Sequence, residues 1–295
     1  MRATPRGIRV RNAAVIVLAL ALLLTLVAAL SGLGDRSARE RCVATVDGGR
    51  VELSTEQMGN AATIAGIAVR RGLPARAATI GLATAFQESK IENIDYGDRD
   101  SLGLFQQRPS QGWGTPAQVQ DPVYATNAFY DGLVKVDDYR TLPITEAAQA
   151  VQRSGFPDAY AQHETRARVL ASALSGSSPA SLGCVLDDDT SSASAEADAD
   201  RLSRAVAAEL PRARIQPVPD RDGVRLRMTQ PAHVWVAAHW TVARADSLAV
   251  ERVYADGRMW SRGSGKPTWE TAAGAGVPPR GSREVVVLQQ DTGPA

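Results

Sequence analysis

The hydrophobic positions of this 295-residue chain follow three successive patterns, and the first is an apolar run without charge over residues 13–30. A run of this length can cross a bilayer as a helix, and the basic residues before it predict that the N-terminus stays inside. We therefore expect a cytoplasmic basic segment at 1–12 and a transmembrane signal-anchor helix at 13–33. A cleaved signal peptide is the alternative, although its apolar core is usually shorter. Both interpretations predict that the remainder of the chain is extracytoplasmic.

The second pattern is helical spacing of apolar residues from about residue 54 to residue 175. Ser54 and Gln57 form a capping-box pair that opens the first helix, and Gly72 follows its end. Pro74 suits the first turn of the next helix. Five helices are expected, at 54–71, 74–89, 122–136, 144–153 and 157–175, with a turn-rich loop at 93–101. The region between the two cysteines, 42–184, is thus predicted to be an all-α domain.

The third pattern begins after a Ser- and Asp-rich stretch at 185–199, whose composition is typical of a linker. An amphipathic helix is expected at 200–210. Strands are expected at 224–228, 234–242, 248–254 and 285–288, with a hairpin turn at Asp256-Gly257. The predicted fold class is therefore α+β overall, with an N-terminal transmembrane helix, an all-α domain, to which the resemblance given below adds a lysozyme-like fold, and a small C-terminal α+β module at 200–290.

The net charge bears on the kind of partner that the protein can bind, and the two cysteines bear on its cellular compartment. Lys plus Arg total 33 and Asp plus Glu total 32, so the net charge of +1 gives no field that would recruit nucleic acid. Cys42 and Cys184 bracket the predicted first domain, and an extracytoplasmic location permits a disulfide between them. In the chain-entropy model a loop of this length stabilises the fold by about 4 to 5 kcal/mol.

Candidate chemistry is concentrated in residues 85–114, AFQESKIENIDYGDRDSLGLFQQRPSQGWG. Glu88 lies at the predicted end of a helix, beside Phe86 and Ile91, where the helix dipole and apolar neighbours discourage ionisation. Its pKa should therefore be raised. Cleavage of a glycan needs a protonated carboxyl group together with amides and hydroxyls that hold an uncharged sugar. This segment supplies both kinds of group.

At Glu88-Ser89 and Gly103-Leu104-Phe105-Gln106 the chain resembles the lytic transglycosylase and goose-type lysozyme group. It resembles more closely the transglycosylase-like domain of actinobacterial cell-wall hydrolases and phage tail proteins. The stretches YGDRDSLGLFQQRPSQGWG, DPVYATNAFY and EAAQAVQRSGFPDAY carry this closer similarity, which covers roughly residues 50–175. The resemblance implies that Glu88 is the general acid. It also implies a set of substrate-binding residues: Ser89, Ser101, Gly103, Phe105, Gln106, Asn127 and Gln152.

One departure from the resembled family concerns a Tyr-Asn-Ala-Gly motif that many members carry on a later helix. The equivalent stretch here is Val151-Gln152-Arg153-Ser154, which has no tyrosine to brace the glutamate. Either Gln152 replaces part of that hydrogen bonding or Tyr160 reaches in from the next helix.

A second carboxylate would decide the product, because hydrolases usually need a nucleophile or base opposite the acid. Asp95, Asp98 and Asp100 are candidates, although turn formation explains this acidic cluster better than calcium binding. Lytic transglycosylases use one glutamate and the acetamido group of the substrate, and we prefer that reaction to hydrolysis.

No metal or cofactor is predicted. His163, His233 and His239 have no zinc-ligand spacing, and no phosphate-binding glycine loop is present. Tyr96 and Trp113 are candidates for stacking on sugars, with core packing equally open. A group of C-terminal aromatics should pack in the core rather than bind the wall: Trp235, Tyr254, Trp260 and Trp269.

The sequence thus predicts a membrane-anchored extracytoplasmic peptidoglycan lytic transglycosylase whose partners are glycan strands and, through the N-terminal helix, the membrane. The alternative is a weakly active or inactive glycan-binding module of a cell-envelope complex, with the C-terminal module contacting an envelope protein.

Overall fold

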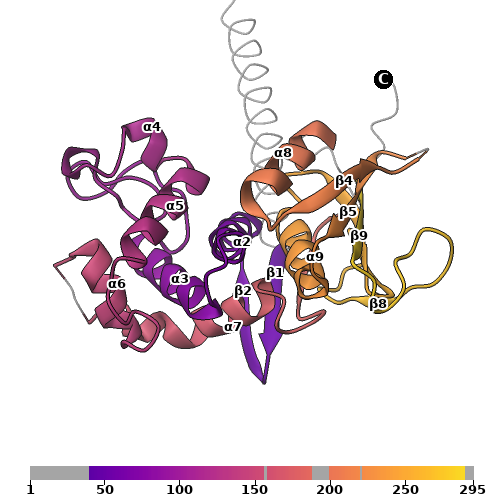
Figure 1. Ribbon diagram of the computed structural model, residues 1–295, viewed down its shortest axis with the longest axis horizontal. Coiled ribbons are helices and arrows are strands. Elements are labelled where there is room, and N and C mark those ends of the chain that lie inside the picture. The colour runs from indigo at the N-terminus through magenta and orange to yellow at the C-terminus, as the bar shows by residue number, and fades with distance from the viewer. Residues whose placement is uncertain (1–39, 156–157, 188–198, 220, 290–295) are drawn as a thin grey trace, which may run out of the picture. The chain divides into compact units, whose positions relative to one another are not determined.

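Helix α2 (Thr55–Arg70) lies at the centre of the structure, and the next helix, α3 (Ala75–Ser89), packs beside it (Figure 1). The structure is a computed structural model that describes residues 40–155, 158–187, 199–219 and 221–289. The predicted capping box is confirmed: Ser54 Oγ accepts from the backbone N–H of Gln57 at 3.1 Å, and the Gln57 side chain accepts from Ser54 N at 3.1 Å. The start of α2 is therefore determined locally.

Helix α2 is buried on almost every side. Of the residues from Met58 to Ala68, all but Asn60 are buried, and most are alanine or glycine. A helix that is apolar all round belongs in the interior. The small side chains let neighbours approach closely: a Cβ on Gly66 would lie 2.9 Å from the carbonyl oxygen of Glu209. Helices α3, α5, α7, α8 and α9 all contact α2.

A three-stranded antiparallel sheet lies beside these helices. Its strands are β1 (Arg41–Val46), β2 (Gly49–Leu53) and β3 (Leu182–Val185), in the order β2-β1-β3. The prediction of an all-α first domain is therefore wrong. The strands are short, and β1 pairs with a strand that lies far along the chain, so local periodicity does not reveal the pairing.

The predicted disulfide is confirmed by this sheet. Cys42 and Cys184 lie opposite each other on β1 and β3, and their sulfur atoms are bonded across a sequence separation of 142. Both cysteines are buried.

In the N-terminal half, the described residues 40–155 and 158–187, α5 (Pro122–Leu133) and α6 (Ile144–Gln152) agree with the helices predicted at 122–136 and 144–153. Helix α7 (Glu164–Leu174) begins later than the helix predicted at 157–175, and the 3₁₀ helix η2 (Ala161–His163) precedes it. The short helix α4 (Pro116–Val119) and the 3₁₀ helix η1 (Pro109–Gln111) were not predicted.

The C-terminal half, the described residues 199–219 and 221–289, is built on a six-stranded antiparallel sheet in the order β4-β5-β9-β6-β7-β8. Helix α8 contacts β4 and β5, and α9 contacts β6 and β9. The predicted hairpin at Asp256-Gly257 is confirmed, because Ala255 pairs with Arg258 across it. The elements are α8 (Ala199–Glu209), β4 (Ala213–Pro217), β5 (Gly223–Met228), η4 (Pro231–His233), α9 (Val234–Ala243), β6 (Val250–Ala255), β7 (Arg258–Ser261), β8 (Glu270–Thr271) and β9 (Glu284–Gln289).

The strand predicted at 234–242 is instead helix α9, and this prediction is wrong. Every residue of α9 is buried, so the segment is apolar on all faces and shows neither helical nor strand periodicity. Its valines and tryptophans favour a strand by propensity, but packing against α2, β3 and β6 overrides that preference.

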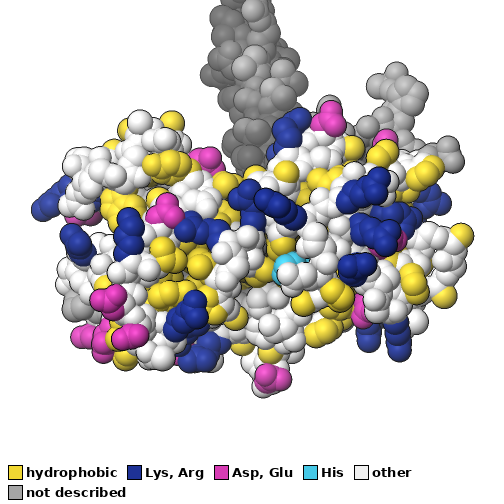
Figure 2. All heavy atoms as spheres, in the orientation of Figure 1, with side chains coloured by type: hydrophobic (Ala, Val, Ile, Leu, Met, Phe, Trp, Pro, Cys, Tyr) yellow, Lys and Arg dark blue, Asp and Glu magenta, His cyan; other side chains and the backbone are white. Residues whose placement is uncertain are grey.

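The predicted fold class also needs correction at its N-terminal end. Within the described ranges, no helix is long and apolar enough to cross a membrane, so the transmembrane helix is not supported. The predicted segments 1–12 and 13–33 lie outside the described residues. The fold of the described chain is α+β with two sheets. Figure 2 shows Lys and Arg side chains spread over the face in view, without one large basic patch.

The two halves share one compact unit from Arg41 onward, although the predicted boundary at 185–199 lies mostly outside the described residues. A buried carboxylate joins them. Glu209 Oε2 accepts from Thr63 Oγ1 of α2 at 2.7 Å and from Trp240 Nε1 of α9 at 2.8 Å, and Arg244 Nη1 lies 3.0 Å from Glu209 Oε1. Both oxygens of the buried Glu209 carboxylate therefore have hydrogen-bond donors.

We expect Glu209→Ala to lower the free energy of unfolding by about 3 kcal/mol, because it leaves a guanidinium and two further donors without their buried acceptor. Urea unfolding followed by tryptophan fluorescence measures the change. Glu52→Ala is the matched control: its ion pairs with Arg41 and Arg50 are exposed, so it should cost about 0 to 1 kcal/mol. Equal losses in the two variants would contradict the role of Glu209.

Candidate functional site

Glu88 lies in the last turn of α3, just before a tight change of direction. Lys90 and Ile91 both adopt left-handed backbone conformations, with φ of 58° and 64°. Their N–H groups donate to the carbonyls of Phe86 and Ala85 at 3.1 and 3.0 Å, which closes the helix end. A β-branched residue in the left-handed region is strained, so the surrounding structure must hold Ile91 in place.

Two amides of α2 hold this turn. Gln57 Nε2 donates to the carbonyl of Lys90, and Asn60 Nδ2 donates to the carbonyl of Ile91, each at 2.9 Å. This second role of the capping-box glutamine was not predicted, and Asn60 was not among the predicted site residues. The contact joins residues more than 30 positions apart, so no local signal reports it.

Tyr160 braces the carboxyl group of Glu88. Its buried side chain donates from the hydroxyl to Glu88 Oε1 at 2.7 Å. Both candidates for replacing the missing family tyrosine act on Glu88, because hydrogen bonds from Tyr160 and Gln152 both lower its pKa. Gln152 Nε2 also donates to the carbonyl of Phe105 at 2.7 Å, which ties the end of α6 to the Gly103–Gln106 turn.

The surroundings of Glu88 favour its protonated form. Burial raises the pKa of Glu88 above its ordinary value of 4.5, and hydrogen bonding by Tyr160 and Gln152 only partly opposes this. Burial also raises the pKa of the Tyr160 hydroxyl, with the adjacent Glu88 carboxylate as the next cause. Tyr160 thus remains a proton donor to Glu88. The direction of the Glu88 shift agrees with the sequence prediction.

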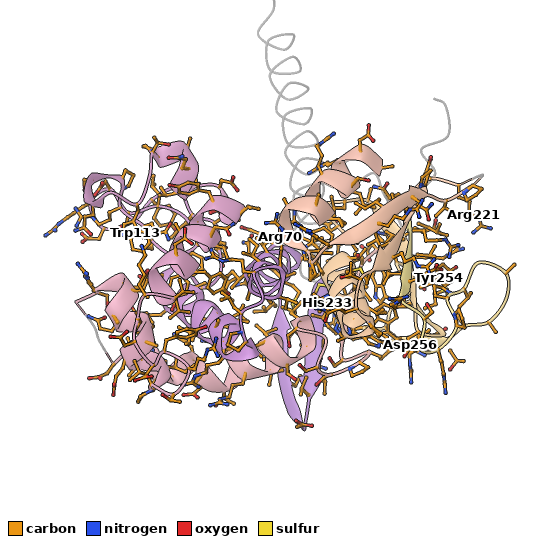
Figure 3. All side chains as sticks on the ribbon, viewed as in Figure 1. Arg70, Trp113, Arg221, His233, Tyr254 and Asp256 are labelled. Atoms are coloured by element: carbon orange, nitrogen blue, oxygen red, sulfur yellow. A yellow bond between two sulfur atoms is a disulfide. The ribbon has the colours of Figure 1, made fainter. Side chains whose placement is uncertain are left out.

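Glu88 opens into a polar cleft of about 540 Å³. Three of the predicted substrate-binding residues, Ser101, Gln106 and Gln152, line it together with Glu88. Trp113, a candidate for stacking on sugars, also lines the cleft, as does Asp98, a candidate second carboxylate. Gln107 lies in the predicted sugar-binding segment and lines it too. The other lining residues were not predicted, namely Arg99, Arg108, Gln111, Arg153, Ser154 and Gly155. In Figure 3 Trp113 lies among the helices of this half, whereas Tyr254 lies on the six-stranded sheet.

Three other predicted residues do not line the cleft but are buried behind it. Ser89 is buried, and its Oγ donates to the carbonyl of Leu104 at 2.8 Å. The Phe105 ring is buried and stacks on Phe129 with 4.7 Å between centroids. Gly103 has a φ of 75°, and a Cβ there would lie 2.3 Å from the Val119 carbonyl oxygen, so only glycine fits.

Asn127 is not placed in the cleft. Its Nδ2 donates to the carbonyl of Val123 at 2.8 Å, and its Oδ1 accepts from Arg71 Nη1 at 3.2 Å. Both partners lie on α5 or at the end of α2, so the described contacts of Asn127 join these two helices.

The acidic cluster divides into different roles. Asp100 accepts from Arg108 Nε at 2.8 Å, from Ser110 N at 2.7 Å and from Ser110 Oγ at 2.9 Å. These bonds, led by the Ser110 backbone N–H, lower the pKa of Asp100. Asp100 thus holds the loop between residues 100 and 110 in place through these hydrogen bonds. Asp98 lines the cleft, but its side chain is 91% exposed.

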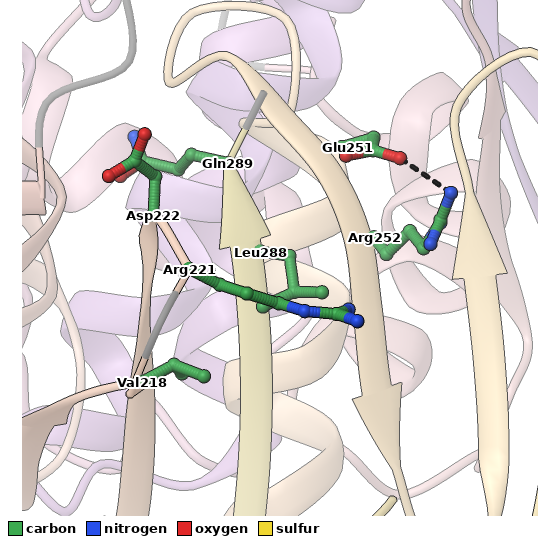
Figure 4. A pocket seen from close by; sticks show the side chains of 7 residues that line it. All are labelled: Val218, Arg221, Asp222, Glu251, Arg252, Leu288 and Gln289. Atoms are coloured by element: carbon green, nitrogen blue, oxygen red, sulfur yellow. Dashed lines mark ion pairs between the residues drawn. The ribbon is translucent and has the colours of Figure 1, made fainter. Parts of the chain in front are cut away.

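The C-terminal half contains a second polar pocket of about 590 Å³ (Figure 4). Arg221 and Arg252 lie in it with Asp222 and Glu251, and Glu251 is ion-paired with Arg252 at 2.7 Å. No residue proposed for catalysis from the sequence lines it.

The predicted core packing of the C-terminal tryptophans is confirmed, whereas Tyr254 is only half-buried. Trp235, Trp260 and Trp269 are buried, and Trp260 and Trp269 donate to the carbonyls of Cys184 and Leu182 at 3.0 and 2.7 Å. The candidate histidines are also internal or half-buried: burial lowers the pKa of His239 to about 4.

The chain matches no protein-family model and no curated protein. The geometry around Glu88 is therefore the basis for assigning a function.

The raised pKa of Glu88 has a consequence for stability. Below its ordinary pKa of 4.5 both folded and unfolded chains are protonated at this position, whereas above it the unfolded chain ionises more readily. Wild-type stability should therefore decline as pH rises through this range because of Glu88. Glu88→Gln cannot ionise and should unfold at a higher temperature than wild type at pH 7. The difference should shrink towards pH 4.5 in thermal unfolding measured by circular dichroism; a less stable variant at pH 7 would contradict it.

Tyr160→Phe removes the hydrogen bond that favours ionised Glu88, so the pKa of Glu88 should rise further. A carboxyl-carbon NMR titration with labelled glutamate would report this as an upward shift of one resonance, which Glu88→Gln identifies by its absence. Tyr139→Phe, in a buried tyrosine of the same half, is the control. An unchanged titration in Tyr160→Phe would show that the bond is unimportant for the acid.

Proposed function

We propose that this chain is an extracytoplasmic peptidoglycan lytic transglycosylase with Glu88 as its single catalytic acid. The observation that carries the proposal is a partly buried glutamate, biased towards its protonated form and braced by Tyr160, at the wall of a polar cleft. A general acid needs this combination of access and raised pKa in order to deliver a proton near neutral pH.

The proposed reaction uses Glu88 twice. Its proton passes to the glycosidic oxygen as the bond to the anomeric carbon breaks, and the acetamido group of the substrate takes the place of the leaving oxygen. The carboxylate of Glu88 then accepts the proton of the 6-hydroxyl while that oxygen attacks the anomeric carbon. This attack breaks the bond between the carbon and the acetamido oxygen, which regenerates the acetamido group and closes the anhydro ring. Atoms balance without water, and Tyr160 stabilises the carboxylate between the two steps by its hydrogen bond.

The lining of the cleft supports a sugar ligand. Ser101, Gln106, Gln111 and Gln152 contribute hydroxyl and amide groups, which suit the hydroxyls and acetamides of amino sugars. Trp113 adds an aromatic face on which a sugar ring can stack.

Lysis is preferred to hydrolysis because no well-placed second carboxylate is available among the described cleft residues. Asp100 is fully engaged by Arg108 and Ser110, and Asp98 is almost completely exposed to water. An exposed carboxylate is poorly oriented for a role as nucleophile or base.

The buried Cys42–Cys184 disulfide supports the proposed compartment. Structural disulfides persist in oxidising surroundings and are rare in the cytosol. A cell-wall substrate would be met in such a compartment.

The decisive experiment incubates the purified full-length chain with peptidoglycan and identifies the released fragments by mass spectrometry. Wild type should release fragments with anhydro ends. Glu88→Gln keeps size and hydrogen bonding but has no acidic proton, so the rate should fall by about 10²- to 10⁴-fold. Glu92→Gln, four positions along the chain and half-buried, is the matched control and should keep wild-type activity.

The other outcomes assign different functions. Reducing ends in place of anhydro ends would make the protein a hydrolase, with Asp98 as the first residue to test. No fragments from wild type, combined with equal binding of peptidoglycan by wild type and Glu88→Gln, would replace the enzyme with a glycan-binding module.

A further inference from the structure

The cleft around Glu88 carries more positive charge than a neutral sugar requires. Three arginines, Arg99, Arg108 and Arg153, are among its lining residues. The lining carboxyl groups are Asp98 and Glu88 itself, and burial favours the uncharged form of Glu88. Near neutral pH the described lining therefore has a surplus of guanidinium groups.

Arg153 is held rigidly at the end of α6. Its φ of 52° places it in the left-handed region, where glycine or asparagine is usual. Gln149 clamps this turn: its carbonyl accepts from Arg153 N at 2.8 Å, its Nε2 donates to the Ser154 carbonyl at 2.8 Å, and its Oε1 accepts from Ser154 Oγ at 3.1 Å. The neighbouring Gln152 is fixed by its bond to Phe105. The backbone that presents Arg153 is thus well constrained.

The other two arginines lie on the segment that follows α3. Asp100 holds Arg108 through Nε at 2.8 Å, so this guanidinium has a fixed orientation. Arg99 makes a long contact of 4.0 Å with Asp98, and both side chains are largely exposed. Such a pair contributes little stability, so Arg99 can exchange Asp98 for another carboxylate at small cost.

We propose that Arg99 and Arg153 bind carboxylate groups of the glycan substrate and make the cleft selective for anionic strands over neutral ones. A guanidinium matches a carboxylate with two parallel hydrogen bonds, which adds orientation to affinity. This inference rests on the proposed function. Two parts of peptidoglycan supply the shared chemistry: lactyl carboxylates exposed after loss of the peptides, and the carboxylates of the peptide stems.

Binding is measured separately from cleavage by using the Glu88→Gln chain, full length, in isothermal titration calorimetry. The three ligands are a neutral N-acetylglucosamine oligomer, glycan strands stripped of peptides, and peptide-bearing strands of the same length. Carboxylate-bearing strands should bind about tenfold more tightly at low salt, with the advantage falling as ionic strength rises. Tighter binding of the stripped strands assigns the lactyl carboxylate, and tighter binding of the peptide-bearing strands assigns the stems.

Adding Arg99→Gln and Arg153→Gln together should abolish this advantage while leaving affinity for the neutral oligomer within about twofold, which also shows that the cleft is folded. Arg153→Lys should retain part of it, because charge is kept and the planar fork is lost. Arg227→Gln, on the exposed face of β5, is the matched control and should change nothing. In the active chain, the double variant should raise KM for peptidoglycan about three- to tenfold at unchanged kcat.

Equal affinity for neutral and anionic strands, or an advantage that survives the double substitution, would overturn the inference even if cleavage by wild type is observed. Conversely, absence of cleavage with a clear arginine-dependent preference would reject the catalytic proposal and keep carboxylate recognition.

Discussion

The burial of α2 on all sides is the constraint on which the rest of the structure depends. A helix can be surrounded this completely only if its neighbours approach its backbone closely, and the run of alanines and glycines between Met58 and Ala68 allows that. The contact at Gly66 leaves no room for a methyl group. Both halves of the molecule therefore use the same helix as the centre of their packing, and Glu209 supplies the polar counterpart of that contact.

Helix α2 also contacts the candidate catalytic site. Gln57 and Asn60 lie in the N-terminal part of α2, and their side-chain amides donate to the strained turn that follows Glu88. Tyr160 approaches the carboxyl group from the segment before α7. Glu88 is thus held by the packed end of α3 and by hydrogen bonds from Tyr160 and Gln152, while the cleft leaves part of its carboxyl group accessible. This arrangement is typical of a preorganised acid, in which the protein holds the group before substrate arrives.

How far the fold and site could be predicted depended on the range of the contacts involved. The start of α2 and the position of Glu88 at a helix end follow from neighbouring residues, and they were predictable. Pairing of β1 with β3 was not predictable from local pattern, because the paired positions Cys42 and Cys184 are 142 residues apart in the sequence. Helix α9 was mistaken for a strand because complete burial removes the periodicity on which the distinction rests. The contact of Tyr160 with Glu88 depends on the path of a loop, and no spacing rule describes such a path.

The disulfide closes a covalent ring around the half of the molecule that contains the cleft. The chain enters that half through β1 and leaves it through β3, and Cys42 and Cys184 are paired across these two strands. Tension between the chain before Cys42 and the chain after Cys184 would pass through one sulfur–sulfur bond. The segments that carry Glu88 and the cleft arginines lie between the two cysteines, so the disulfide bypasses them and they would bear none of that tension.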